Sequence, residues 1–235
     1  MSGLAATMRL ELRLQQRYGF LYAAVFSAAV WLAILLPIPA GYRDVAAPLV
    51  LFGDLLIVAF FFIAGSLFFE KGERTLFALV VTPLRFGAYI VAKLVTLTAL
   101  TVVLSFAIIL PVHGVGFDVP LVLLGAVTGA LVMLLVSFSS AVPYVSITDW
   151  VLPSTFWLGL LNVPLIHYSG LWEHPVLYLI PTQGPLLMFG AAFGQIELTG
   201  AQLAACVLVP LVWTGVLLVI ARRVFQRYIV AGEGT

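Results

Sequence analysis

Six long runs of apolar residues, nearly free of charged side chains, constrain this 235-residue chain more than any other feature. A helix rises about 1.5 Å per residue, so about 20 residues cross the ~30 Å hydrocarbon core of a bilayer. Only 9% of the residues are charged, against roughly 25% in a soluble domain. The sequence therefore predicts an all-α integral membrane protein that forms one domain, residues 1–235. The six predicted transmembrane helices are residues 20–39, 48–69, 87–112, 119–143, 151–168 and 201–222.

A seventh apolar run, Pro175–Phe193, is interrupted by three prolines and by two glycines. Proline removes a helical hydrogen bond and clashes with the preceding turn, so one unbroken helix is not expected here. Backbone that is not helical at membrane depth must be buried in protein or line a wet cavity. We therefore predict that residues 171–195 form a re-entrant or external helical hairpin on the outer face, before the sixth span.

The basic residues are distributed very unevenly between the two ends of the predicted spans. With six spans both termini lie on one side, and that side holds ten of the eleven Lys and Arg residues. The positive-inside rule makes it the cytoplasmic side of the plasma membrane, the inner membrane of a prokaryote. Only Arg43 lies opposite. The ten are Arg9, Arg13, Arg17, Lys71, Arg74, Arg85, Lys93, Arg222, Arg223 and Arg227.

Residues 1–18 are compatible with an amphipathic helix. Three arginines recur every four residues and form a basic stripe, while Leu4, Met8 and Leu12 form an apolar one. This pattern is typical of a helix that lies in the membrane interface with its basic side towards the lipid headgroups. A solvated helix end with a few leucines is the alternative.

Residues 70–86, between the second and third spans, form the only long interruption that is both charged and patterned. A short helix fits Thr75–Thr82, because Leu76, Leu79 and Val80 follow the i, i+3, i+4 spacing of one apolar stripe. Acidic residues precede this helix and a proline ends it, as expected at the two helix termini. Its apolar face would dock either on the membrane or on another protein.

The string E-K-x-E-R-T-L-x-A-L-x-V-T-P-L, followed by Tyr89 and Lys93, resembles the signature after the second span of ABC-type-2 transporter permeases of the drug-export type. The resemblance implies that the short helix is a coupling helix, which sits in a cleft of a separate ATPase. It also implies ABC ATPase subunits and a second permease copy, in a homodimer or heterodimer, as partners. The residues that it assigns to coupling are Glu70, Glu73, Arg74, Thr75, Leu76, Leu79, Val80, Thr82 and Pro83.

The sequence contains no G-x-x-x-x-G-K-[ST] motif, so the chain is not expected to cradle ATP phosphates. We expect no catalytic residues and no cofactor in this chain, with ATP and Mg on the partner ATPase, and no nucleic-acid partner. The predicted function is that of the permease subunit of an ATP-driven exporter for a hydrophobic or amphiphilic small molecule, as in multidrug efflux. The alternatives are an ion-coupled secondary transporter and a membrane scaffold without transport activity.

The resemblance also implies that spans two and five border the substrate route, for which Asp54, Phe61, Trp157 and Asn162 are the candidates. Asp54 is the one carboxylate inside a predicted span, and an ionisable group there is a functional candidate by default. It lies near the outer end of its span, so a structural role remains the alternative. For the aromatic residues of span two, ordinary bundle packing is the alternative.

Three further features have structural interpretations. Lys93 lies near a helix end, so its ammonium group is expected to reach the interface, with an ion pair to Glu70 or Glu73 as the alternative. His113, His167 and His174 lack the ligand spacing of a zinc site, so no metal is expected. Gly125 and Gly129 form a G-x-x-x-G motif, which favours close helix packing within the chain.

Overall fold

The computed structural model describes residues 2–76, 86–172 and 174–232, and these residues form helices and turns without any strand. The predicted all-α class is therefore confirmed for the described part of the chain. The first half contains α1 (Ser2–Arg17), α2 (Phe20–Leu35), α3 (Ala40–Asp54), the π-helical turn η1 (Leu55–Phe60), α4 (Phe61–Gly72) and α6 (Phe86–His113). The second half contains α7 (Val119–Ala141), α8 (Ile147–Asn162), α9 (Pro164–Tyr168), the 3-10 helix η2 (Pro175–Leu179), α10 (Gln183–Ala192), α11 (Gly200–Phe225) and the π-helical turn η3 (Gln226–Val230).

Four helical segments of the described chain are long and apolar enough to cross a membrane. They are Ala40–Gly72, Phe86–His113, Val119–Ala141 and Gly200–Val230. A fifth is added if the pair Ala5–Arg17 and Phe20–Leu35, which is bent by 63°, counts as one span. The predicted run 151–168 is divided between α8 and α9, each shorter than a full span.

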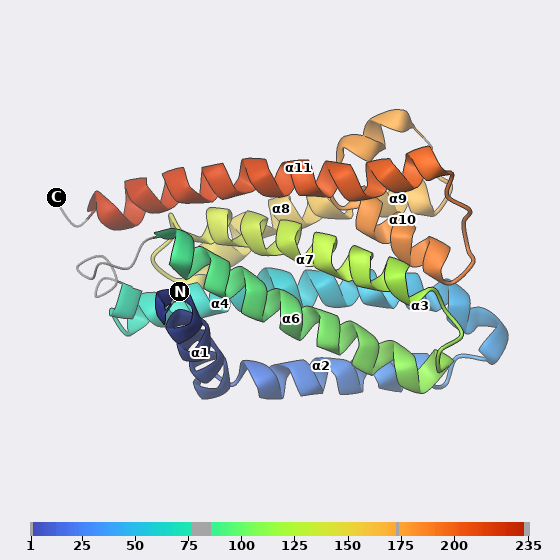
Figure 1. The fold of residues 1–235 in the computed structure, drawn as a ribbon, viewed down its shortest axis with the longest axis horizontal. Coiled ribbons are helices and arrows are strands. Elements are labelled where there is room, and N and C mark those ends of the chain that lie inside the picture. The colour runs from blue at the N-terminus through green and yellow to red at the C-terminus, as the bar shows by residue number, and fades with distance from the viewer. Residues whose placement is uncertain (1, 77–85, 173, 233–235) are drawn as a thin grey trace.

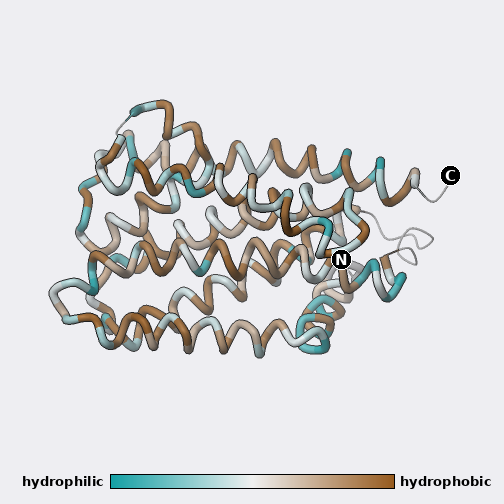
Figure 2. The backbone as a smooth tube through the Cα atoms, turned by 180° about the vertical axis from the view of Figure 1, so that it is seen from behind, coloured by the Kyte–Doolittle hydropathy of each residue, from teal (hydrophilic) through white to brown (hydrophobic). Residues whose placement is uncertain are grey.

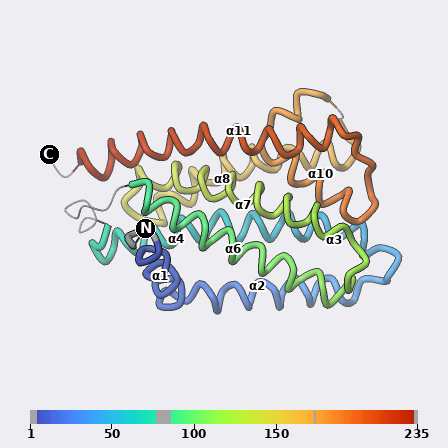
Figure 3. The backbone as a smooth tube through the Cα atoms, viewed as in Figure 1, coloured from blue at the N-terminus to red at the C-terminus, as the bar shows by residue number. Residues whose placement is uncertain are grey.

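The long helices lie side by side along the longest axis of the molecule, and α1 crosses one end of them (Figure 1). The two termini, the end of α4 and the beginning of α6 lie at this same end, whereas α9 and the neighbouring hairpin lie at the other (Figures 1 and 3). Hydrophilic residues gather on α1 and at the two ends, and the long helices between them are mainly hydrophobic (Figure 2). The apolar runs of the sequence thus form the helices that lie along the long axis of the bundle.

Helix α7 lies at the centre of the bundle and packs against α6, α8, α10, α11 and η1. Its two motif glycines allow this close packing. A Cβ atom added at Gly125 would lie 2.7 Å from the Phe189 ring, and one at Gly129 would lie 2.7 Å from Leu55 Cδ1. Since both neighbours belong to the same chain, the G-x-x-x-G motif forms an intrachain contact, as the sequence favoured.

The segment 171–195 is not one helix, as its prolines predicted. It forms η2 and then α10, whose residues are almost all buried among α3, α7 and α11. A Cβ atom added at Gly184 would lie 2.2 Å from the carbonyl oxygen of Cys206, so only glycine fits between the backbones of α10 and α11. The backbone of α10 is therefore enclosed by protein, whereas Val176 and Leu179 of η2 are exposed.

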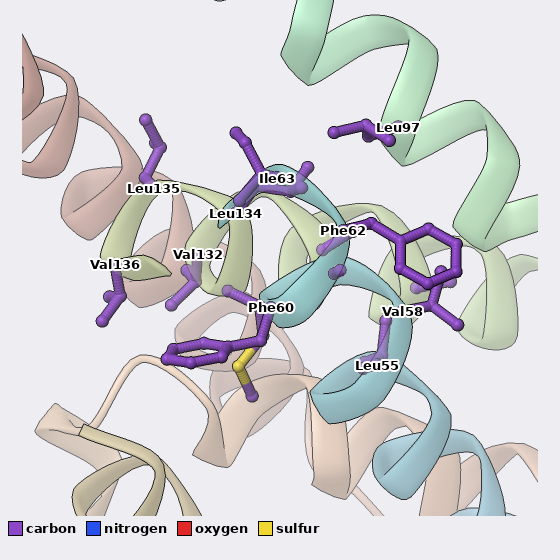
Figure 4. Packing of buried hydrophobic residues seen from close by; sticks show 14 of the residues in the cluster. Leu55, Val58, Phe60, Phe62, Ile63, Leu97, Val132, Leu134, Leu135 and Val136 are labelled. Carbon is purple, nitrogen blue, oxygen red and sulfur yellow. The ribbon is translucent and has the colours of Figure 1, made fainter. Parts of the chain in front are cut away.

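The helix from Ala40 to Gly72 changes to π-helical hydrogen bonding between Leu55 and Phe60. A π-turn displaces backbone carbonyl groups from the regular pattern, and such groups need other partners. Here the hydroxyl of Ser137 on α7 donates a hydrogen bond to the carbonyl oxygen of Phe60. Apolar side chains from η1, α4, α6 and α7 fill the space around this contact (Figure 4).

Candidate functional site

Lys93 lies at the centre of a buried cluster of polar side chains where α1, α4 and α6 meet. Its ammonium group is fully buried and donates hydrogen bonds to Ser66 Oγ at 2.6 Å, to Glu11 Oε2 at 3.1 Å and to Glu70 Oε1. The hydroxyl of Tyr89 donates a hydrogen bond to the other oxygen of Glu70 at 2.7 Å. We call these five residues the Lys93 cluster.

The expectation that the Lys93 ammonium reaches the membrane interface was wrong. Its side chain is 0% exposed, because α1 covers this turn of α6 and supplies Glu11 as a second anionic partner. A buried charge is tolerated only when other charges and hydrogen bonds compensate for the lost water. The two carboxylates and the Ser66 hydroxyl provide that compensation.

Helix α1 turns one polar face towards the protein, and its arginines are exposed on the other side. Thr7, Glu11 and Gln15 are buried, whereas Leu10 and Leu12 are about half exposed. Gln15 Nε2 donates a hydrogen bond to Thr96 Oγ1 on α6 at 2.8 Å, one turn beyond the Lys93 cluster. Sequence reasoning missed Glu11 and Gln15, although their i, i+4, i+8 spacing with Thr7 was a signal for one polar face.

A second contact between α1 and the end of α4 lies at the surface. Arg17 Nη2 donates a hydrogen bond to Glu73 Oε1 at 2.9 Å, and the Tyr18 hydroxyl donates one to Glu73 Oε2 at 3.0 Å. The Tyr18 ring also stacks on Phe69, with ring centroids 4.8 Å apart. The junction of α1 and α2 is therefore fixed to the last turn of α4.

Lys71 connects the same end of α4 to α7. Its ammonium group donates hydrogen bonds to the carbonyl oxygens of Val142 and Tyr144, both at 2.6 Å. These carbonyls follow the C-terminal end of α7, where a positive charge interacts favourably with the helix dipole. The last turn of α4 thus contacts α1, α6 and the C-terminal end of α7.

The predicted coupling residues are only partly described. Glu70 faces the interior, as part of the Lys93 cluster, and Glu73 is paired with Arg17 and Tyr18. Arg74 has a left-handed backbone with φ of 57°, which ends α4, and Thr75 Oγ1 donates a hydrogen bond to the Glu70 carbonyl at 3.2 Å. Leu76 is fully buried within the chain. Leu79, Val80, Thr82 and Pro83 lie outside the described residues.

The four candidate route residues make separate contacts. Asp54 is fully buried, and its Oδ1 atom accepts a hydrogen bond from Ser27 Oγ on α2 at 2.9 Å. Asn162 donates to the Leu158 carbonyl of its own helix at 2.7 Å. Trp157 is 39% exposed and contacts the ring of its neighbour Phe156.

Phe61 belongs to an aromatic cluster around Trp150, which is fully buried at the start of α8. The rings of Phe60 and Phe68 contact the same indole. Phe62 points elsewhere and stacks on Phe20, with ring centroids 5.1 Å apart. The span-two aromatics therefore join η1 and α4 to α2 and α8.

The histidines lie at the end of the bundle opposite α1. His167 and His174 line a cavity there, and His113 Nε2 lies 3.2 Å from Asp44 Oδ1. Within the described residues no group of three or more His, Cys, Asp or Glu side chains could hold a metal ion.

Comparison with known proteins decides the family. The fluoroquinolones export permease protein family matches residues 2–233 of this chain. The chain belongs to this family. The matched region, residues 2–233, includes all of the helices described above.

Two curated relatives of this export permease come from Mycobacterium tuberculosis, strains CDC 1551 / Oshkosh and H37Rv. Both are called fluoroquinolones export permease protein, and each is 49% identical over 235 residues, with 100% of this chain and 99% of the relative covered. No solved structure matches the chain. The predicted resemblance to drug-export permeases is confirmed, as is the function class of an export permease in the membrane.

Proposed function

We propose that this export permease is the membrane subunit of an ABC exporter that moves fluoroquinolone-type drugs out across the plasma membrane. A separate ATPase chain binds and hydrolyses ATP with Mg, and a second permease, identical or related, completes the pore. The observation that carries the proposal is the family match over residues 2–233, together with the names of relatives that are 49% identical. The sequence itself has no phosphate-cradling loop, so in an ATP-driven exporter another chain would hydrolyse the ATP.

The contacts of the helices that flank residues 77–85 in the sequence support a coupling role for this segment. It connects α4 with α6, and the described residues on both sides of it are held by the Lys93 cluster. Lys71 and Glu73 extend these contacts to α7 and α1. Because α4, α6 and α1 are joined by buried ionic hydrogen bonds, a displacement of the segment by an ATPase would move these helices together.

The proposed topology has six spans, with both termini in the cytoplasm. In this topology α1 lies along the cytoplasmic interface, which the 63° bend between α1 and α2 supports, and α8 with α9 forms the fifth span. The arginines of α1 and of the end of α11 support this orientation, because they lie at the same end of the bundle (Figure 1). The hairpin of η2 and α10 then faces outwards.

Transport into inside-out membrane vesicles tests the proposal. Vesicles that contain the permease and its ATPase should accumulate a fluorescent fluoroquinolone when ATP is added, and vanadate should stop the accumulation. The matched control is the same complex with the phosphate-binding lysine of the ATPase replaced by alanine. Accumulation that is independent of the ATPase would refute the ABC mechanism.

A proton-coupled carrier is the second candidate, and the buried carboxylate of Asp54 is the observation that favours it. Buried acids inside spans are typical of proton-coupled transport. In that case a protonophore would abolish accumulation, vanadate would not, and Asp54→Asn would remove the dependence on a pH gradient. For the ABC exporter we expect the opposite responses to the two inhibitors.

A further inference from the structure

A cavity of about 570 Å³ is lined by elements that lie at the end of the bundle opposite α1 (Figure 1). It lies between α9, η2, the middle of α10 and the loop that leads into α11. This volume is within the range of sites for drug-sized molecules, roughly 300–1,000 Å³. The residues that line it are His167, Tyr168, Ser169, Gly170, His174, Pro175, Tyr178, Leu187, Ile196, Glu197, Leu198 and Gln202.

Aromatic rings form one side of this outer cavity. The His167 and Tyr178 rings meet edge to face, with centroids 5.7 Å apart and planes at 78°. Tyr168 adds a third ring, and Leu187 and Ile196 add apolar surface. Such a lining suits a flat aromatic molecule, and tyrosine faces also attract cations.

Glu197 is the one carboxylate among the described residues that line the outer cavity. It is exposed at the mouth of the cavity, and the cavity lining contains neither Lys nor Arg. The one basic residue assigned to the outer side, Arg43, uses its guanidinium group on the Ile38 and Leu36 carbonyls, at 2.8 and 2.9 Å. A ligand with a positive charge would therefore complement this surface.

The walls of the outer cavity are fixed by specific contacts. A Cβ atom at Gly190 would lie 2.7 Å from the Tyr168 ring, so α10 seats this ring closely. Trp213 Nε1 on α11 donates a hydrogen bond to the Leu179 carbonyl at 2.9 Å, which holds the end of η2. Thr199 and Gln202 form a capping box that begins α11 beside Glu197. A site formed in advance in this way loses less entropy when a ligand binds.

We propose that the outer cavity binds an aromatic compound that carries a protonated amine, as a release site for the exported drug. The amine lies beside the Glu197 carboxylate, and the aromatic ring packs against Tyr178 and His167. A fluoroquinolone with a piperazine group has this chemistry. The identity of the drug rests on the proposed function, but binding at this site requires neither ATP nor the ATPase.

The test is equilibrium binding to the purified full-length permease in lipid nanodiscs, without the ATPase. The probe is norfloxacin, whose piperazine amine is protonated, and its fluorescence anisotropy reports binding. The second probe is its N-acetyl derivative, in which that amine is neutral. The variants are Glu197→Gln, which removes the charge, and Tyr178→Leu, which removes the ring. Asp44→Asn is the matched control, since it removes an exposed acid at the same end of the bundle outside the cavity lining.

We expect Glu197→Gln to weaken norfloxacin binding about fivefold, the effect of one partly exposed charge contact. Tyr178→Leu should weaken it about two- to fivefold, through loss of ring and cation–π contact. Acetylation of the probe should reproduce the effect of Glu197→Gln and add nothing in that variant. Asp44→Asn should bind as the unmodified permease does, and all variants should elute as folded protein.

Equal affinities of the unmodified permease, Glu197→Gln and Tyr178→Leu would overturn this inference, as would equal affinities for the two probes. The outcome is separate from that of the vesicle experiment. If ATP-driven efflux is normal and binding is unchanged in these variants, only the proposed outer site is refuted. If binding is weakened in the variants but no ATP-driven efflux is found, the ABC mechanism is refuted and the outer site is supported.

Discussion

Lys93 of α6 donates a hydrogen bond at 3.1 Å to the carboxylate of Glu11 in α1, although 82 positions of the chain separate them. Glu70 at the end of α4 accepts from the same ammonium group. Three helices therefore meet at one buried cation, beside the segment that is proposed to contact the ATPase. This relationship explains how a helix outside the apolar bundle is held to it.

Removal of the Lys93 charge should destabilise the permease strongly. In Lys93→Met two carboxylates remain buried without their cation, and breaking such a pair costs about 3–5 kcal/mol. We expect a clear fall in the midpoint of thermal unfolding, measured by size-exclusion after heating. Arg13→Gln is the control, because Arg13 is an exposed cation on the same helix as Glu11.

The triple variant Glu11→Gln, Glu70→Gln, Lys93→Met separates charge from packing. If the loss in Lys93→Met arises from unpaired buried carboxylates, neutralising both should recover much of the thermal stability. A triple variant that is no more stable than Lys93→Met would show that the unpaired carboxylates of Glu11 and Glu70 do not cause the loss.

Gly184→Ala should disturb the packing of α10. An added Cβ atom would lie 2.2 Å from the Cys206 carbonyl oxygen, and overpacking of this kind costs roughly 1–3 kcal/mol. Gly159→Ala in α8 is the matched control, since no atom lies within 4 Å of its Cβ position. We expect lower yield and a lower unfolding temperature for the first variant only, and equal values would contradict the close approach of α10 and α11.

Substitution by aspartate should have different effects at Leu76 and at Leu79, although the sequence pattern placed both on one apolar stripe. Leu76 is fully buried in the chain, so Leu76→Asp should reduce the amount of folded permease. Leu79→Asp should leave the permease inserted and folded but prevent co-purification with the ATPase. Normal co-purification and normal efflux in Leu79→Asp would mean that the segment does not dock on the ATPase.

Cysteine labelling tests the topology. In a Cys206→Ser background, Ser169→Cys should react with a membrane-impermeant maleimide added to intact cells, because Ser169 is exposed at the proposed outer end. Glu233→Cys, near the C-terminus, should react only after the membrane is opened. Reaction of the cysteine at position 233 in intact cells would contradict the arrangement of six spans with both termini inside.

The all-α membrane class, the approximate positions of the long helices and the break before α11 could be predicted from the amino-acid sequence. These follow from hydropathy and proline, which act locally along the chain. Charge asymmetry and the Glu70–Lys93 string also indicated the orientation and the family before any contact was known. The G-x-x-x-G motif of α7 predicted a close contact because small side chains leave room for a neighbouring helix.

The partners of the charged residues depend on how distant helices pack against one another. Lys93 was expected to reach the interface because it lies near a helix end, with an ion pair to Glu70 or Glu73 as the alternative. Its ion pair depends on Glu11 and Glu70, which α1 and α4 bring to α6 from distant parts of the sequence. In the same way, the outer cavity forms from α9, η2, α10 and the loop before α11, and no local pattern reports how four such segments meet. Long-range pairing depends on how the helices pack, and the periodicity of one helix does not contain that information.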